Sequence, residues 1–443
     1  MCYRHRMRWI AMKTTDAPIP IVLPRSQHNV SRSLIDPDAV KVMYRLVRNG
    51  FKAYLVGGSV RDLLLGRIPK DYDVATDARP GEIKRLFHNC RIIGRRFRIV
   101  HVFFRDNKII EVSTFRKDPD EQVAPEQEGQ EPTRRGDNTF GQPHEDAFRR
   151  DLTINGLFYD ISTFSVIDYV GGIADLRAGI IRAVGDADER FREDPVRMIR
   201  AVRHAARTGF NIEPATYEAI LRNAGLLKTC NVSRLQDELQ KDLAAGGVQS
   251  VFQLHKKMGL IAAYFPALDT YLDRPARPDA IFHPSWVWTA LSRLDAGMED
   301  PGLTPFYSIL SLLYPLLEEE LLSRHSSLGE AQRDATDVHQ TLKQLGMTFG
   351  ARRKDQERTT TLWFAFVRMM VALREGRMPP RFRKRPYFHA VIQFYRFQQA
   401  VEGHPEEEIS QRLATALQSD LASPRRRRAG RRRGRRTTGA PEF

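Results

Sequence analysis

The chain reads Leu55-Val56-Gly57-Gly58-Ser59-Val60-Arg61-Asp62, and after Gly66 it continues with Lys70-Asp71-Tyr72-Asp73. Apolar residues run into a glycine pair, which predicts a buried strand that turns into a short helix. In an extended strand alternate side chains share one face, so we expect Asp71 and Asp73 to lie side by side. Two adjacent carboxylates can hold two divalent cations, an arrangement that supports in-line phosphoryl transfer.

The glycine pair suits a phosphate group. Gly57 and Gly58 let backbone N–H groups approach phosphate oxygens, and a helix opening at Ser59 directs its positive end toward them. An Asp-x-Asp pair alone is more typical of a solvated turn than of a metal site. Joined to Gly-Gly-x-x-Arg at this spacing, it indicates a site for a metal-bound triphosphate held by the glycines and Arg61.

The composition points to a polyanionic partner. Of the 443 residues 42% are hydrophobic, which is ordinary for a globular protein, but the formal net charge is +16. Nucleic acid is favoured over an acidic membrane surface as the partner. Half of the excess is local, because the segment from Pro424 to Phe443 holds nine arginines and one acid, a net charge of +8.

Three cysteines without a Cys-x-x-Cys pair argue against structural zinc and against a disulfide framework. The basic N-terminus precedes an apolar patch that is too short for a signal peptide. The richest apolar stretches fall short of the roughly 20 residues that span a bilayer. We therefore expect a soluble cytoplasmic protein without a transmembrane segment, and loose association with a membrane surface stays open.

The chain is expected to be an α+β protein with several parts. Strands are predicted at 52–56, 71–76, 91–104 and 108–114, and helices at 37–49, 59–65, 80–87 and 194–207. This pattern predicts an extended N-terminal arm (1–35), a head with a mixed sheet (36–175) and a mobile loop (117–143), a helical neck (176–265), a helical body (266–405) and a disordered Arg-rich tail (406–443).

Two acidic residues have more than one interpretation. Glu111 lies on the strand 108–114, where a lone acid either faces solvent or adds a further carboxylate beside the two aspartates. Asp194 precedes Pro195, which is typical of an N-cap followed by proline at the first helical position. For both residues, the sequence pattern alone does not decide between a structural role and a role in the active site.

Further segments complete a recognisable pattern: Arg149-Arg150-Asp151-Leu152-Thr153-Ile154-Asn155, then Asp168-Tyr169-Val170-Gly171-Gly172, then Arg192-Glu193-Asp194-Pro195-Val196-Arg197-Met198-Ile199-Arg200. With the glycine and aspartate motifs, they resemble the class II nucleotidyltransferases, which comprise CCA-adding tRNA nucleotidyltransferases and bacterial poly(A) polymerases. The resemblance covers roughly residues 20–265. It implies a polymerase-β-like head followed by all-helical neck and body domains.

The resemblance also implies roles for single residues. Asp71 and Asp73 would hold two Mg²⁺ ions, and Asp151 would join them as an active-site acid. Arginines and acids elsewhere would bind the nucleotide: Arg150 near the sugar, and Asp194, Arg197 and Arg200 at or near the base. Without the resemblance, the two arginines of the 194–207 helix would be interpreted as a solvated helix face.

Other segments favour the poly(A) branch. The stretch from Ile92 to Val102 is similar to the poly(A) polymerase signature, and its basic cluster (Arg95, Arg96, Arg98) is also typical of a protected edge strand. The basic tail is predicted to tether RNA, through Arg425, Arg426, Arg427, Arg428, Arg431, Arg432 and Arg433.

The implied activity is template-independent transfer of AMP from ATP to single-stranded RNA 3′ ends, releasing pyrophosphate and promoting RNA turnover. The protein is expected to act as a monomer, and RNA-decay proteins stay open as partners. CCA addition is the alternative activity. A non-catalytic RNA-binding protein is the alternative of another class, and the intact aspartate pair argues against it.

Overall fold

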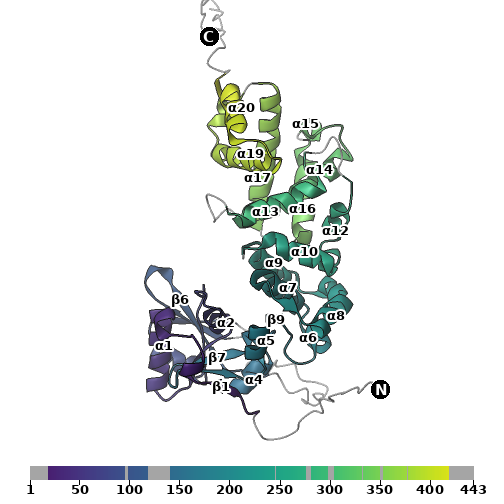
Figure 1. Ribbon diagram of the computed structural model, residues 1–443. Helices are drawn as coiled ribbons and strands as arrows, with labels where there is room; N and C mark the ends of the chain where they lie inside the picture. Colours follow the sequence, from purple (N-terminus) through teal and green to yellow (C-terminus); the bar gives the residue numbers. More distant parts are fainter. Residues whose placement is uncertain are drawn as a thin grey trace, which may run out of the picture. The chain divides into compact units, whose positions relative to one another are not determined.

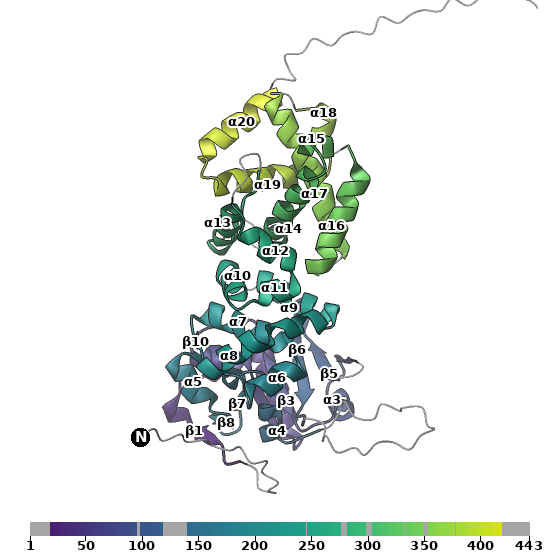
Figure 2. The same cartoon turned by 90° about the vertical axis from the view of Figure 1, so that its right-hand side faces the viewer.

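The computed structural model describes residues 18–94, 98–117, 140–244, 246–275, 281–297, 304–331, 333–349, 353–376 and 378–418. The chain divides into two compact units, Met1–Thr270 and Tyr271–Phe443. The first unit contains a β-sheet and the helices that follow it, and the second is built from helices (Figures 1 and 2).

An eight-stranded sheet forms the head. The strands, in spatial order, are β1 (Ile21–Leu23), β8 (Ser165–Asp168), β7 (Leu157–Asp160), β2 (Ala53–Val56), β3 (Asp73–Thr76), β6 (Ile109–Thr114), β5 (Ile99–Phe103) and β4 (Cys90–Ile93). Neighbouring strands pair antiparallel, except that β3 and β6 run parallel. The predicted mixed sheet is confirmed.

Different helices pack on the two faces of the sheet. Helix α1 (Pro37–Arg48) packs on β2 and β3, and α3 (Pro80–Leu86) packs on β4 and β5. On the other face Val56, Ala75 and Phe158 form a buried cluster with Ala147 of α4 (Pro143–Phe148). Because side chains alternate along a strand, Asp73 shares this second face with Ala75.

Two predicted strands have different bounds. β3 begins at Asp73, so Asp71 lies in the preceding loop rather than on the strand. The stretch 91–104 is two strands that pair antiparallel, with Ile93 opposite Ile99. Gly94 lies between them with a φ of +88°, a left-handed conformation that favours glycine and ends β4.

The prediction of an extended arm over residues 1–35 is wrong for its C-terminal part, which contains a strand and two short helices. Ile21 to Leu23 form β1, which pairs with β8 at the edge of the sheet. Two short 3₁₀ helices, η1 (Arg25–Gln27) and η2 (Arg32–Leu34), follow. A three-residue strand between Pro20 and Pro24 is too short to show alternation, so the sequence pattern did not reveal it.

A helical layer follows the sheet within the first unit. Its main helices are α5 (Gly172–Ala178), α6 (Ala187–Glu193), α7 (Val196–Thr208), α8 (Pro214–Asn223), α9 (Val232–Ala244), α10 (Val248–Lys257), α11 (Leu260–Tyr264) and α12 (Pro266–Leu272), with α12 ending across the unit boundary. Short pieces join them: η4 (Thr153–Asn155), η5 (Ala224–Thr229), β9 (Ile180–Ile181) and β10 (Asn211–Ile212). Helix α7 packs against α9 and α10, which makes it the centre of this layer.

The second unit contains α13 (Pro284–Asp295), α14 (Thr304–Leu322), α15 (Leu328–Ala331), α16 (Ala335–Phe349), α17 (Arg353–Arg374), α18 (Pro380–Arg383), α19 (Phe388–Val401) and α20 (Glu406–Gln418). The predicted disorder from residue 406 is wrong for α20. Its residues Ile409, Leu413 and Ala416 are buried, and the helix packs on α17 and α19.

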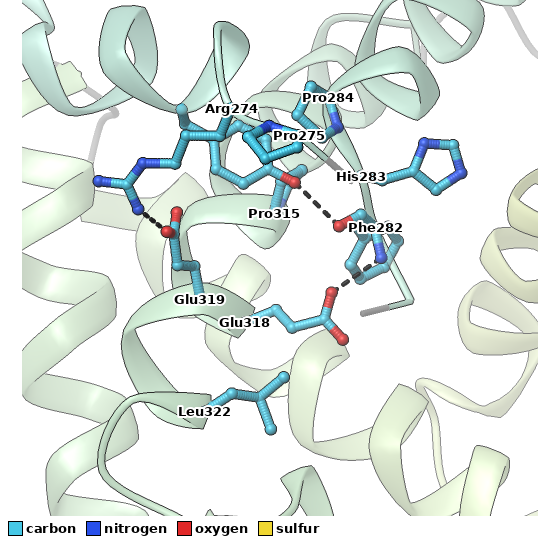
Figure 3. A pocket seen from close by; sticks show the side chains of 10 residues that line it. Arg274, Pro275, Phe282, His283, Pro284, Pro315, Glu318, Glu319 and Leu322 are labelled. Atoms are coloured by element: carbon cyan, nitrogen blue, oxygen red, sulfur yellow. Dashed lines mark hydrogen bonds and ion pairs between the residues drawn. The ribbon is translucent and has the colours of Figure 1, made fainter. Parts of the chain in front are cut away.

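A buried glutamate joins two helices of this second unit. The Glu318 carboxylate of α14 accepts backbone N–H groups from Ile281 and Phe282, both at 2.8 Å. It lines a pocket of about 30 Å³ in which Arg274 also pairs with Glu319 (Figure 3). Because these polar groups satisfy one another, Glu318 fixes the segment that leads into α13.

No described helix is long and apolar enough to cross a membrane. The predicted mobile loop lies largely at 118–139, outside the described residues, as do 1–17 of the predicted arm and 419–443 of the predicted tail.

Candidate active site

The turn after β2 brings the backbone close to an arginine. Gly57 has a φ of +70°, and a Cβ at this position would lie 2.9 Å from Nη1 of Arg150. Helix α2 (Gly58–Leu64) begins directly after it. The positive φ, combined with a ψ of −132°, therefore requires glycine at position 57, and the close approach of Arg150 favours it further.

Two carboxylates lie side by side at the start of β3. The parallel register pairs Asp73 with Glu111 of β6, so the two side chains are neighbours across the strands. Asp73 reaches solvent but is surrounded by protein on most sides. This desolvation, followed by the negative charges of Glu111 and Asp71, raises the pKa of Asp73 to about 6, although Arg150 acts against it.

Arg150 is held beside this group by α4 and the sheet. Its Nη2 donates to Asp146 Oδ2 at 2.9 Å, its Nη1 donates to the Asn155 carbonyl at 3.2 Å, and its guanidinium lies 5.3 Å from the Phe158 ring centre. Although burial raises the pKa of Asp146, Arg150 and Arg149 hold it below its usual value. Asp146 is therefore a charged anchor that orients Arg150.

The described residues contain no cluster of three or more His, Cys, Asp or Glu side chains arranged to hold a metal ion. Asp73, Glu111 and Asp71 are thus neighbours rather than a closed cage. Magnesium uses oxygen ligands and is commonly bound by one or two carboxylates together with substrate phosphates and water. An open pair of carboxylates beside a glycine turn fits that requirement.

Asp151 does not belong to this carboxylate group, contrary to the prediction. Its carboxylate pairs with Arg200 Nε at 2.5 Å and accepts from Asn155 Nδ2 at 3.2 Å and from the Leu152 amide at 2.9 Å. Despite its burial, Arg200 and then His204 hold the pKa of Asp151 well below its usual value. The residue after Arg150 points toward α7 and not toward Asp73.

Arg61 and Arg200 also belong to this buried network. Arg61 is buried, and its Nη1 contacts Asn155 Oδ1 at 2.8 Å and His204 Nδ1 at 3.1 Å, while its Nη2 pairs with Asp62. Arg200 Nη1 lies 3.5 Å from Glu238 Oε1 of α9, in addition to its pair with Asp151. Both arginines thus take part in contacts between the head and α7, and their contact with nucleotide stays a prediction.

The other residues predicted to recognise the base lie at the junction of α6 and α7. Arg197 Nη1 pairs with Glu193 Oε2 at 2.8 Å, and its Nε lies 4.0 Å from Asp194 Oδ2. Asp194 accepts from Arg234 Nη2 of α9 at 2.6 Å. The structure brings Asp194 and Arg197 together, as expected, but the Asp194 side chain does not cap α7, whose N-cap is Pro195.

Sequence reasoning missed several partners of these residues. Asp146 and Glu193 orient Arg150 and Arg197, and each acid lies four residues before its arginine, a spacing that could have identified them. Asn155 and His204 gave no such signal, because their contacts with Arg61 join distant parts of the chain.

The predicted RNA contacts lie largely outside the described residues. Arg95, Arg96 and the tail arginines are not among them. Arg98 is exposed, and its carbonyl accepts from Arg116 Nη2 at 3.0 Å. β4, which precedes this cluster, is an edge strand of the sheet.

Comparison with known proteins identifies the family. Residues 53–182 match the model of the poly A polymerase head domain, and residues 209–272 match a probable RNA- and SrmB-binding site of polymerase A. Poly(A) polymerase I of Salmonella typhimurium is 37% identical over 402 residues, which is 90% of this chain and 85% of that protein. The chain belongs to the poly(A) polymerase family. The predicted resemblance is confirmed, and the protein is a nucleotidyltransferase of this family.

Other relatives extend the comparison. Poly(A) polymerase I of Haemophilus influenzae is 35% identical over 88% of the chain and 86% of its own length. A CCA-adding enzyme of Lactobacillus gasseri is 42% identical, but over 50% of the chain and 54% of that enzyme. A tRNA nucleotidyltransferase solved with a primer tRNA and an incoming ATP analog shares the fold, with a TM-score of 0.54 at 21% identity, covering 86% of this chain and 99% of that one.

Proposed function

We propose that this poly(A) polymerase family member transfers AMP from ATP to RNA 3′ ends without a template. The observation that carries the proposal is the length of the similarity. Over half of the chain, identity to a CCA-adding enzyme reaches 42%, so a partial match does not separate the two activities. Similarity over 90% of the chain and 85% of the relative is found with poly(A) polymerase I.

The reaction joins the RNA 3′ oxygen to the α-phosphorus of ATP. The bond between that phosphorus and the oxygen leading to the β-phosphorus breaks, pyrophosphate leaves, and the hydroxyl proton is released. Little covalent chemistry is required of the protein, so positioning and charge neutralisation supply most of the acceleration. The geometry at Gly57, Arg150 and Asp73 supports these two tasks.

Each residue then has a distinct task. Gly57 allows the backbone and Arg150 to approach the same phosphate groups, and Gly58 opens the helix behind them. Arg150, oriented by Asp146, contacts the nucleotide. Asp194 and Arg197, oriented by Arg234 and Glu193, recognise the base.

Asp73 and Asp71 are the residues proposed to hold two magnesium ions, with Glu111 as the third neighbouring carboxylate. Bound magnesium would lower the pKa of the 3′ hydroxyl and neutralise the triphosphate. Because the pKa of Asp73 is about 6, its carboxylate is mostly ionised at neutral pH and is available as a ligand.

The proposal also includes the role of the protein in the cell. Adenylation of single-stranded 3′ ends would promote RNA turnover in the cytoplasm, with the protein acting as a monomer beside RNA-decay proteins. Light scattering after gel filtration tests the monomer, and co-purification from a lysate before and after RNase treatment tests direct contact with decay proteins.

Sequencing the products decides the activity. Purified protein is incubated with all four nucleotides and either an unstructured RNA or a tRNA that lacks its terminal C-C-A. We expect runs of A well beyond three residues on both substrates. Addition that stops after C-C-A on tRNA would instead support the alternative activity.

A matched variant tests the metal assignment. Asp73→Asn keeps the size of the side chain but removes the charge, so we expect a folded protein with incorporation reduced by about 10³-fold or more. A folded Asp73→Asn protein that incorporates AMP near the wild-type rate would contradict the assignment. Wild type that binds RNA but transfers nothing would favour the non-catalytic alternative.

A further inference from the structure

A basic cleft of about 340 Å³ lies in the first unit at the end of α7 opposite to the proposed base-recognition site. Its walls are the segment that follows α2, the last turn of α7 and the glycine turn between α9 and α10. Cations dominate its lining (Arg61, Arg67, Lys70, Arg207), and among the described lining residues Asp62 is the one carboxylate. The volume is at the low end for ligand sites.

The positive charge of this cleft is poorly neutralised. Asp62 is already paired with Arg61. Arg67, Lys70 and Arg207 are exposed, and none of the three forms an ion pair within the part of the chain that the structure describes. Desolvation and the neighbouring charges of Arg61, Arg203 and Arg67 lower the pKa of Arg207, although Asp62 opposes them. An anion placed there would relieve this repulsion.

The position of the cleft favours a strand of RNA over the nucleotide. Arg207 lies ten residues after Arg197 on α7, which places the two about 15 Å apart along the helix axis. A nucleotide whose base contacts Arg197 therefore leaves the cleft open. At its other wall Lys70 directly precedes Asp71, so the cleft begins next to the proposed reaction centre.

The chemistry of the lining also suits a polynucleotide. Ile68 is 83% exposed between the cations of the cleft. Single-stranded nucleic acids are bound by cations that track the phosphates together with apolar surface for the bases and sugars. A small inorganic anion would use the cations and would not need the exposed isoleucine.

We propose that the cleft formed by Arg67, Ile68, Lys70 and Arg207 binds the sugar-phosphate backbone of the RNA strand just upstream of its reacting 3′ end. The inference rests on the proposed function, since it assumes that RNA is the acceptor. It adds an RNA contact within the head and at the end of α7, separate from the Arg-rich tail.

The test uses the full chain and a labelled 15-nucleotide oligoadenylate. Arg67→Ala/Arg207→Ala is compared with Arg48→Ala, which removes an exposed arginine of α1 outside the cleft. Binding is measured in the Asp73→Asn background, so that the probe is not extended. We expect the double variant to bind about tenfold more weakly near 0.1 M salt, and its log–log salt slope to flatten by about 1.4, corresponding to two lost phosphate contacts.

A second measurement separates RNA from ATP. In the active protein, the double variant should raise the KM for oligoadenylate about tenfold while the KM for ATP changes less than twofold. Arg67→Lys/Arg207→Lys should restore most of the binding, which shows that charge rather than folding is responsible. Equal melting temperatures of wild type, the alanine double variant and the lysine double variant provide the folding control.

The outcomes are distinct. An increase in the KM for ATP with unchanged RNA binding would assign the cleft to the nucleotide and overturn the inference, as would unchanged values throughout. If wild type transfers no AMP but the double variant still loses RNA affinity and salt slope, the proposed function fails and the RNA cleft stands.

Discussion

At the residue scale, Gly57 combines two constraints that can be separated by experiment. Gly57 and Gly66 both have a φ of +70°, but a Cβ would meet Arg150 at position 57 and nothing within 4 Å at position 66. Alanine at either site should destabilise the fold because of the positive φ, and the cost should be larger at position 57, where ψ is −132° and lies outside the left-handed helical region. Gly57→Ala should in addition displace Arg150 and raise the KM for ATP about tenfold.

Thermal or urea unfolding measures the shared cost, and steady-state kinetics measures the effect specific to Gly57. Gly66→Ala is the matched control and should keep the wild-type KM for ATP. If both variants raise KM equally, backbone strain rather than the Arg150 contact explains the glycine.

The pKa of Asp73 predicts a pH dependence. Its folded value of about 6 lies above the ordinary value of 3.8. Between these values the folded state binds more protons than the unfolded state, so the contribution of Asp73 to stability, present below about pH 4, is lost as the pH rises through 6. Glu111→Gln removes the neighbouring charge and should lower the pKa of Asp73.

This shift is measurable in metal-free protein by following the Asp73 carboxyl carbon in an NMR titration. Wild type should titrate near pH 6 and the Glu111→Gln variant at lower pH. An unchanged titration would mean that Glu111 is not a close electrostatic partner of Asp73.

At the scale of elements, α7 carries two arginines one turn apart that form different ion pairs. Arg197 is paired with Glu193 near the start of the helix, whereas Arg200 is paired with the buried Asp151. Arg197→Ala should reduce the ratio of ATP to CTP incorporation about tenfold, with little loss of folding free energy. Arg200→Ala leaves Asp151 buried without its partner and should destabilise the fold, toward the lower end of about 3–5 kcal/mol because Arg200 is partly exposed.

Parallel ATP and CTP incorporation assays and urea unfolding distinguish the two variants. Arg200→Ala, assayed where it is folded, should keep the wild-type ratio of ATP to CTP incorporation. The assignment would be wrong if Arg200→Ala altered the ratio and Arg197→Ala altered only stability.

The elements that the sequence predicted well are those with local signals. The strand before Gly57, the helix that opens after it and the strand of Asp73 follow from an apolar run, a glycine pair and alternation. The neighbouring position of Glu111 could not be derived, because it depends on which strand pairs with β3 and in which register. The contact of Asp151 with Arg200 likewise joins residues 49 apart in the chain. Such long-range pairs determine which charged side chains face substrate and which face the core.

Helix α20 shows the opposite effect, because it has a local signal that the composition of the neighbouring segment outweighs. Pro405 followed by Glu406 to Glu408 is typical of a helix start, and Ile409, Leu413 and Ala416 follow with helical spacing. The Arg-rich composition from position 425 onward predicts disorder and outweighs this local pattern. β1 carried no signal at all, since three residues cannot show a period.

At the scale of the whole molecule, charge is concentrated at the C-terminal end. Pro424 to Phe443 contribute +8 of the net charge of +16 and contain none of the residues assigned to the nucleotide. If this segment tethers RNA, deleting it should weaken binding and flatten the salt dependence while sparing catalysis at saturating RNA. Each phosphate contact on a single strand contributes a log–log slope of about −0.7, so the loss of about five contacts flattens the slope by roughly 3–4.

Two full-length variants make this last test specific. Replacing the nine arginines by lysine retains the charge and should retain the slope, whereas replacing them by serine should reproduce the deletion. Titration of a labelled oligonucleotide at several salt concentrations compares all four proteins. A segment that serves only solubility would leave the slopes equal. Because the proposed cleft accounts for a flattening of about 1.4 and the tail for roughly 3–4, the combined variant should lose close to the sum if the two sites bind different phosphates, and less if they compete for the same ones.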